Sequence, residues 1–233
     1  MKEKETGTWK IWAVTIFLFA IVVAATIRVS TLPVLNFTAK GSKVHIVIDP
    51  GHGGFDPGKV GTMGTLEKDV NLNISLKLRE ILTKSGYTVA MTREKDEALC
   101  GETTGKKKVE DLNARLAVID KEKPELTVSI HQNSYSAGTK GAQVFYYSGS
   151  EDGKRLANVL QETIKEEMGD GNHRVEKAND SYYMLKKSSG PFVIIECGFL
   201  SNPEEEKLLI SEEYQQKMAK AVAEGIEKFL YNE

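Results

Sequence analysis

The sequence predicts an α/β domain with three layers, in which helices flank one mixed, mostly parallel sheet of about six strands. Short apolar runs alternate along the chain with longer segments whose apolar residues recur every three or four positions. These are the spacings of strands and of amphipathic helices. The apolar runs, such as His45–Ile48, contain few polar residues, which is typical of strands covered on both faces. We therefore expect one domain built around a buried sheet.

The N-terminal part of the chain has a different character. The run Ile11–Ile27 contains no charged residue, and basic residues flank it. Such a run is barely long enough to cross a bilayer as a helix, and it also suits the apolar part of a signal peptide. We therefore predict a signal anchor or signal peptide over residues 1–28, a linker over 29–43 and the globular domain over 44–233. Either interpretation places that domain outside the cytoplasm, anchored to the membrane or secreted.

The first part of the globular domain is predicted to form a strand, a loop, a helix and a second strand. Apolar residues at four-residue spacing mark the helix, and Gly86 behind it is typical of the left-handed position after a helix end. A strand, a crossover helix and a strand in this order predict parallel pairing. The expected segments are the strand His45–Ile48, the glycine-rich loop Gly51–Thr65, the helix Leu66–Ser85 and the strand Tyr87–Thr92.

The second part continues this alternation and closes with helices. Asn202 and Pro203 are a predicted helix start, because asparagine caps the first amides and proline is favoured in the first turn. The last helix has an apolar stripe from Tyr214 to Phe229. The segments expected between these parts are the loop Glu94–Lys108, the helix Val109–Lys121, the strands Leu126–Ile130 and Ala142–Tyr147, the helix Glu151–Met168, a loop Gly169–Ser189 with a short helix around Tyr182–Leu185, and the strand Phe192–Ile195.

Composition excludes some classes of function. The chain has 31 basic and 33 acidic side chains and a net charge of -2, whereas nucleic-acid binders usually carry a basic excess, so we expect no nucleic-acid partner. The two cysteines, Cys100 and Cys197, form no CxxC pair, which excludes a structural zinc site made of cysteines. We interpret Cys197 as a small buried apolar side chain, and no feature of the sequence supports a disulfide between the two.

Two of the four histidines lie where an apolar strand gives way to a loop. His52 lies in the glycine-rich loop after the first strand, and His131 ends a later strand. The carboxyl ends of strands in open α/β sheets meet at the edge where ligands bind. Two imidazoles and a carboxylate there would supply the three protein ligands of a catalytic zinc site. We interpret His45, inside a strand, and His173, in a polar loop, as structural residues.

The third ligand would be a carboxylate, and the spacing alone does not choose among the candidates. Glu67 has one advantage, because it begins a predicted helix, and negative charge is stabilised at a helix N-terminus. Asp49 has a competing interpretation as a turn residue before Pro50. The candidates are Asp49, Asp56, Glu67 and Asp69.

Glu196 directly follows the apolar strand Phe192–Ile195. A carboxylate in such a place is paired, bound to a metal or held with a raised pKa. Beside a zinc-activated water it would serve as general base and then as acid toward the leaving amine. The alternative interpretation is a buried ion pair with Arg93 or Arg115.

Four separated parts of the chain carry these residues in one order: Ile48–Gly54, Glu67, Ser129–Asn133 and Glu196–Asn202. Together they resemble the signature of the zinc-dependent N-acetylmuramoyl-L-alanine amidases of the Amidase_3 type. The similarity runs from about Val44 to about Leu230, essentially the whole globular part. The resemblance implies that the metal ligands are His52, Glu67 and His131, that Glu196 is the catalytic glutamate, and that a mixed sheet carries an open substrate groove.

The resemblance also implies an activity. The chain would be a hydrolase that uses Zn²⁺ to cleave the amide bond between the lactyl group of N-acetylmuramic acid and L-alanine in cell-wall peptidoglycan. Its short architecture is similar to the amidases of endospore formers that act in sporulation and germination on cortex peptidoglycan, where stem peptides are removed before muramic lactam forms. Expected partners are peptidoglycan, the membrane through residues 1–28, and an activator protein. The alternatives are a zinc carboxypeptidase acting on the stem peptide and a non-catalytic glycan-binding relative.

Overall fold

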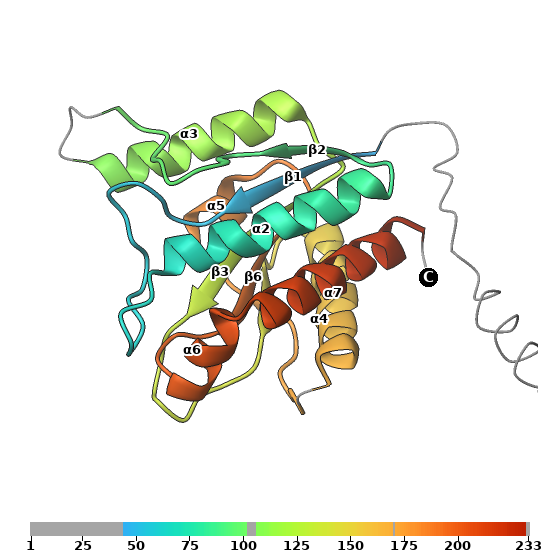
Figure 1. Cartoon of the computed structure of the whole chain (residues 1–233). Helices are drawn as coiled ribbons and strands as arrows, with labels where there is room; N and C mark the ends of the chain where they lie inside the picture. Colours follow the sequence, from blue (N-terminus) through green and yellow to red (C-terminus); the bar gives the residue numbers. More distant parts are fainter. Residues whose placement is uncertain (1–43, 102–105, 170, 232–233) are drawn as a thin grey trace, which may run out of the picture. The chain divides into compact units, whose positions relative to one another are not determined.

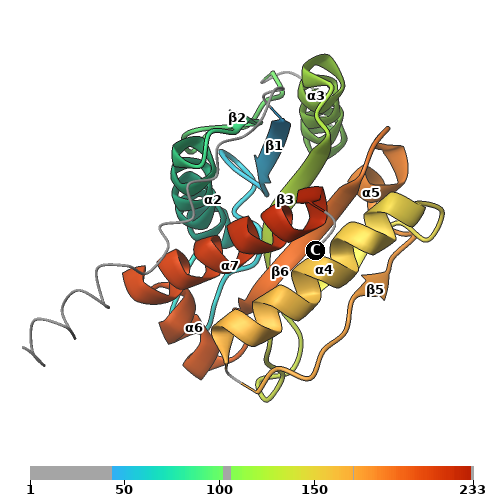
Figure 2. The ribbon, with the colours of Figure 1, turned by 90° about the vertical axis from the view of Figure 1, so that its right-hand side faces the viewer.

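The computed structural model describes residues 44–101, 106–169 and 171–231, which form one six-stranded sheet with helices on both faces (Figures 1 and 2). This confirms the predicted fold class. The strands are β1 (His45–Pro50), β2 (Thr88–Met91), β3 (Leu126–Asn133), β4 (Gln143–Tyr146), β5 (Lys177–Ala178) and β6 (Phe192–Phe199). They lie side by side in the order β2-β1-β3-β6-β4-β5.

The sheet is mixed, and its parallel part creates the edge that matters. β1 pairs in parallel with β2 and with β3, and β3 pairs in parallel with β6. β4 pairs antiparallel with β6 and parallel with β5. Because β1, β3 and β6 run in the same direction, their carboxyl ends meet at one edge of the sheet. In the register of that edge, His131 on β3 lies opposite Glu196 on β6.

Helices bury the two faces of the sheet in separate apolar clusters. One cluster joins Ile46, Ile48 and Val128 to residues of α2, α4 and α7, and the smaller one joins Val47 and Ile194 to residues of α3 and α5. Alternation along each strand divides the side chains between the two faces. The helices are α2 (Glu67–Lys84), α3 (Lys107–Glu122), α4 (Glu151–Met168), α5 (Tyr183–Lys187), α6 (Pro203–Leu209) and α7 (Glu212–Tyr231).

The helix ends follow the predicted signals. Gly86, just beyond α2, has a φ of +92°, a left-handed conformation that favours glycine. The side chain of Asn202 accepts hydrogen bonds from the amides of Glu204 and Glu205, at 2.9 and 3.3 Å, and so caps α6. Both positions therefore set where a helix ends or begins for the reasons that the sequence indicates.

Several strand boundaries differ from the sequence-based expectation. β6 continues past Glu196 to Phe199, and β3 continues past His131 to Asn133, so neither residue ends its strand. The apolar run that predicts each strand ends before these positions, but Asn133 still pairs with Phe199 after a register irregularity. β5 lies within the predicted loop Gly169–Ser189, and its two residues are exposed, so no apolar pattern marks it.

The predictions for the N-terminal part fall on residues that the structure does not describe. The expected signal segment 1–28 and the linker 29–43 both lie there, as does the apolar run Ile11–Ile27. Among the described residues, no helix has the length and hydropathy of a membrane span.

Candidate active site

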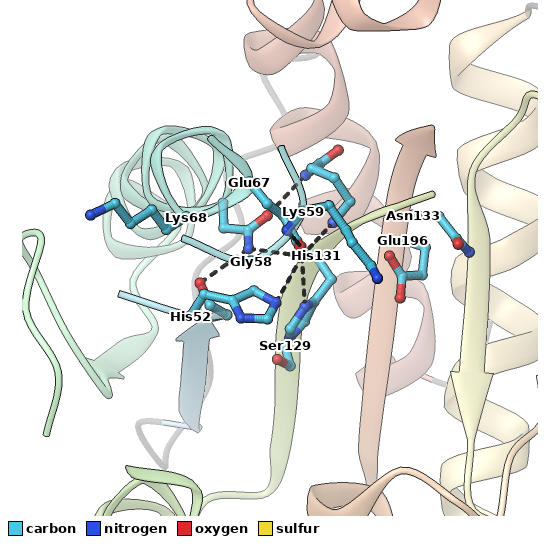
Figure 3. A network of polar contacts seen from close by, with 12 residues as sticks. His52, Gly58, Lys59, Glu67, Lys68, Ser129, His131, Asn133 and Glu196 are labelled. Carbon is cyan, nitrogen blue, oxygen red and sulfur yellow. Dashed lines mark hydrogen bonds and ion pairs between the residues drawn. The ribbon is translucent and has the colours of Figure 1, made fainter. Parts of the chain in front are cut away.

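Three of the predicted ligand candidates converge at the edge formed by β1 and β3 (Figure 3). His52 follows β1, Glu67 begins α2 and His131 lies in β3. Nε2 of His52 is 3.2 Å and Nδ1 of His131 is 3.0 Å from Oε1 of Glu67. One donor atom from each residue lies within 4.8 Å of the other two. Two imidazole nitrogens and one carboxylate oxygen at this separation suit a single zinc ion and leave room for further ligands.

Glycines let the loop backbone close around this cluster. A Cβ on Gly51 would lie 2.2 Å from Cε1 of His131, and one on Gly58 would lie 2.5 Å from Oε2 of Glu67. His52 itself has a φ of 61°, which is uncommon for a residue other than glycine. Backbone strain of this kind collects at functional sites, where the surrounding contacts enforce it. The glycine-rich loop is therefore required by the close approach of its backbone to the ligands.

Glu67 is held on both carboxylate oxygens. Oε2 accepts the amide of Lys59 at 2.7 Å, and Oε1 accepts the amide of Gln132 at 3.1 Å. Burial would raise the pKa of Glu67, but hydrogen bonds from His131 and His52 lower it far below its usual value. The carboxylate is therefore ionised in a fixed orientation, as a metal ligand must be.

Asp56, another candidate ligand, lies behind His52. Its Oδ2 is 3.0 Å from Nδ1 of His52, while its Oδ1 is 3.0 Å from the ammonium of Lys108. A carboxylate on the second imidazole nitrogen fixes the tautomer and the orientation of a metal-binding histidine. Burial would lower the pKa of His52, but Glu67 and Asp56 raise it. The structure thus separates Asp56 from the converging donor atoms and gives it an orienting contact.

Asp49 and Asp69 do not join the cluster. Asp69 is exposed on the first turn of α2. Asp49 is buried and pairs with Arg115, whose Nη1 is 2.8 Å from Oδ1. Arg115 also binds Asp111 at 2.7 Å, so the expected alternative of an ion pair between Glu196 and Arg115 is wrong.

Arg115 and Arg93 secure the loop that carries His52. Nη1 of Arg115 donates to the carbonyl of Pro50 at 2.8 Å, and Nη2 donates to the carbonyl of His52. Nε of Arg93 donates to the same Pro50 carbonyl, and its Nη2 donates to the carbonyl of Gly51, both at 3.0 Å. These guanidinium groups provide hydrogen-bond donors to backbone carbonyls at the end of β1 and in the loop behind it. The sequence indicates both arginines only as alternative partners of Glu196, and Arg93 forms no such pair.

Glu196 faces the same cavity with one carboxylate oxygen unpaired. Its side chain is buried, with 6% of its surface exposed. Oε1 accepts the hydroxyl of Tyr182 at 3.4 Å, and Oε2 has no hydrogen-bond partner among the described residues. Burial, opposed by the nearby His131, raises the pKa of Glu196 to about 7. A buried carboxylate with an available oxygen and such a pKa is suited to proton transfer.

The cavity that joins these groups has a volume of ≈ 310 Å³. Aromatic and apolar side chains of α3, α5 and β6 form much of its wall. The sequence predicts Tyr182 only as part of a short helix, and no motif indicates its contact with Glu196. The lining residues are His52, Lys59, Glu67, Leu112, Ser129, His131, Gln132, Asn133, Ser134, Tyr182, Tyr183, Met184, Ile194 and Glu196.

The remaining histidines and the cysteines lie outside the cluster. His45 pairs with Glu122 at 3.4 Å, and His173 is exposed in a loop. Cys197 is fully buried, and both it and Cys100 are free thiols. These positions agree with the structural interpretation given to His45, His173 and Cys197.

Comparison with known proteins decides the family. The family model described as Amidase_3, N-acetylmuramoyl-L-alanine amidase, matches residues 46–228. The chain belongs to this family. It is therefore a hydrolase that acts on peptidoglycan as an N-acetylmuramoyl-L-alanine amidase.

Individual relatives agree with this assignment. The amidase is 37% identical over 188 residues to the germination-specific N-acetylmuramoyl-L-alanine amidase of Bacillus subtilis (strain 168), a match covering 79% of this chain and 78% of that protein. Among solved structures, the CwlD amidase from Clostridioides difficile in complex with the GerS lipoprotein is 42% identical, with a TM-score of 0.79 over 82% of this chain and 100% of that one. The amidase AmiC2 of Nostoc punctiforme is 36% identical, with a TM-score of 0.71 over 82% and 99%.

Proposed function

We propose that this amidase is zinc-dependent and that His52, Glu67 and His131 hold the ion. The observation that carries the proposal is the convergence of their three donor atoms within 4.8 Å around an ionised carboxylate. The donor set of two nitrogens and one oxygen matches that of catalytic zinc sites. When bound, zinc would polarise the amide carbonyl and lower the pKa of a water molecule.

Glu196 is the proton-transfer group in this proposal. Its unpaired Oε2 takes a proton from the attacking water as the water oxygen bonds to the lactyl carbonyl carbon. The same carboxyl then delivers the proton to the nitrogen of L-alanine as the carbon–nitrogen bond breaks. The pKa of about 7 allows both the acceptance and the return of the proton near neutral pH. Tyr182, hydrogen-bonded to Oε1, fixes the orientation of the carboxyl group.

We further propose a role in the spore cortex. The support is the similarity to the germination-specific amidase of Bacillus subtilis, at 37% identity. In this role the enzyme removes stem peptides from cortex glycan before muramic lactam forms. The substrate lies outside the cytoplasm, so residues 1–28 would act as an export signal or membrane anchor, 29–43 as a linker and 44–233 as the zinc amidase catalytic domain.

An activating partner protein completes the proposal. The relative from Clostridioides difficile is described in complex with the GerS lipoprotein, and this chain aligns over all of that amidase. We expect the purified domain to turn over slowly alone and faster with a lipoprotein of that kind. Full turnover of the domain alone, with no complex by size-exclusion chromatography, would contradict this part.

Metal analysis tests the ligand assignment. The parent protein should contain one zinc per chain by atomic spectroscopy, and His131→Ala should lose it, because removal of one of three protein ligands weakens metal binding steeply. His173→Ala, which replaces an exposed histidine outside the cluster, is the matched control and should retain the metal. Equal zinc content in parent and His131→Ala would show that the assignment is wrong.

Product analysis tests the reaction and the cortex role. With cortex and vegetative peptidoglycan as substrates, mass spectrometry should find released stem peptides that begin with a free L-alanine. Release of a single terminal amino acid would instead identify a carboxypeptidase. Equal rates on both kinds of peptidoglycan would argue against a cortex-specific role.

A further inference from the structure

Lys59 is an exposed residue at the cavity, and its ammonium group forms no ion pair with the described residues. It lines the same cavity as His52, Glu67, His131 and Glu196. Its backbone is fixed there, because its amide donates to Oε2 of Glu67 at 2.7 Å and its carbonyl accepts the Glu67 amide at 2.9 Å. Figure 3 shows its side chain extending from beside Glu67 toward the side of the site where Glu196 lies.

Three other cations near the site already have partners in the chain. Lys108 pairs with Asp56 at 3.0 Å, Lys68 with Asp96 at 2.7 Å and Arg115 with Asp49 at 2.8 Å. Within the described part of the chain, no carboxylate forms an ion pair with the ammonium of Lys59. A fixed backbone and an unpaired charge on a cavity wall leave this group available to an anion from outside.

Where every muramic acid of the glycan carries a stem peptide, the substrate of the amidase has such an anion on the peptide side only. The glycan strand of N-acetylated sugars is uncharged, and the lactyl carboxyl is consumed in the scissile amide. Free carboxylates therefore occur on the peptide beyond L-alanine. We propose that Lys59 is a specificity-determining residue that binds a carboxylate of the stem peptide during amide hydrolysis. A charge-assisted hydrogen bond of this kind selects an acidic peptide over an amidated one.

This inference rests on the amidase function and is tested with a matched pair of substrates. Two synthetic muramoyl peptides are compared, one with its peptide carboxylates free and one with all of them converted to carboxamides. Parent enzyme should prefer the free acid. Lys59→Met should raise KM for the acid about five-fold, with kcat nearly unchanged and no effect on the carboxamide, the size expected of a partly solvated ion pair. Lys59→Arg should keep the preference.

Binding without turnover gives a second readout. The released acidic peptide should bind Glu196→Gln protein about five-fold more tightly than Glu196→Gln/Lys59→Met protein by calorimetry, and added salt should reduce this difference. Lys84→Met, which removes one positive charge from the exposed end of α2, should match the parent in both assays.

The outcomes separate two failures. Suppose that the parent enzyme hydrolyses both substrates. If kcat/KM of Lys59→Met then falls by the same factor on both, or does not fall on either, the assignment of Lys59 is overturned. If parent enzyme releases peptide from neither substrate, the proposed reaction fails. The binding difference between the two Glu196→Gln proteins then decides the role of Lys59 by itself.

Discussion

Two buried carboxylates show how local contacts decide the chemistry of one residue type. Burial would raise the pKa of Asp49, but Arg115 and the hydroxyls of Ser129 and Thr92 lower it to about 2. Glu196, which has a single long hydrogen bond from Tyr182, keeps the effect of burial, and its pKa rises to about 7. Fixed hydrogen-bond donors stabilise the ionised form of a buried carboxyl group, and burial without such donors destabilises that form. The first carboxylate is therefore structural, and the second is available for proton transfer.

At this scale the first prediction concerns Glu196→Gln. The amide keeps the shape of the side chain but cannot accept the proton, so turnover should fall about 10²–10⁴-fold. Zinc content and the circular dichroism spectrum should match the parent. Glu204→Gln, an exposed change on α6, serves as the control and should leave turnover intact. Activity of Glu196→Gln within a few-fold of the parent would assign proton transfer to another group.

At the scale of elements, α6 holds the loop that leads into α2. Glu206, fully buried on α6, accepts the Thr62 hydroxyl at 2.6 Å and the amides of Met63 and Thr65 at 3.0 and 3.3 Å. This loop connects Lys59 and Gly58 to the start of α2, where Glu67 lies. One carboxylate therefore connects α6 to the segment that positions a candidate ligand.

Substitution of Glu206 by alanine should loosen this loop. Several donors would lose their acceptor, which should lower the free energy of unfolding by about 1–3 kcal/mol. Hydrogen exchange at the amides of Met63 and Thr65 should become faster. Glu204→Ala, on the exposed face of the same helix, should change neither quantity. Unchanged exchange in Glu206→Ala would mean that the loop is held by other contacts.

At the scale of the whole molecule, the sheet unites groups that are far apart in the chain. His52, Glu67, His131 and Glu196 come from four different elements or loops, and β3 at the centre of the sheet contacts both β1 and β6. Asp49 also connects distant segments, since it accepts hydrogen bonds from Thr92, Arg115 and Ser129, which come from three other parts of the chain. Global stability should therefore depend on the ionisation of this one carboxylate.

Acid titration should reveal that dependence. The pKa of Asp49 falls from an ordinary 3.8 to about 2 on folding. Its ionised carboxylate therefore stabilises the fold fully at pH values above the unfolded-state pKa of 3.8. This contribution to the free energy of unfolding is about 2 kcal/mol, at about 1.4 kcal/mol per pKa unit. It is lost as the pH falls through the folded-state pKa of about 2. In urea unfolding, Asp49→Asn should show a smaller loss of stability than the parent between about pH 4 and pH 2. Asp152→Asn, exposed on α4, should keep the parental slope. Parallel slopes for Asp49→Asn and the parent would refute the assignment.

Removal of the N-terminal segment tests the domain boundaries. A chain beginning near Leu32 should be soluble and should bind zinc, because residues 44–231 contain the whole sheet and the candidate ligands. In cells, the full chain should fractionate with the envelope, and protease added to intact protoplasts should digest the domain. Digestion only after lysis would place the domain in the cytoplasm and exclude a wall substrate.

The sequence by itself determined the architecture and the candidates. Apolar periodicity marked the strands and helices, and Gly86 and Asn202 marked helix ends, because these signals depend on neighbours within a turn or two. The motifs around His52, His131 and Glu196 indicated the family for the same reason, since each is a local pattern. The two-residue strand β5 escaped detection, because its exposed residues carry no such pattern.

Only the tertiary structure distinguished between acidic residues that look alike in the sequence. Asp49, Asp56 and Glu67 all lie near His52 in the chain. In the structure Asp49 pairs with Arg115, Asp56 contacts Nδ1 of His52, and Glu67 contacts the imidazoles of both His52 and His131. The contacts of Asp49 and Glu67 depend on Arg115 of α3 and His131 of β3, dozens of residues away in the chain. The unpaired ammonium of Lys59 became visible in the same way, because charge compensation is a property of neighbours in space and not of neighbours in sequence.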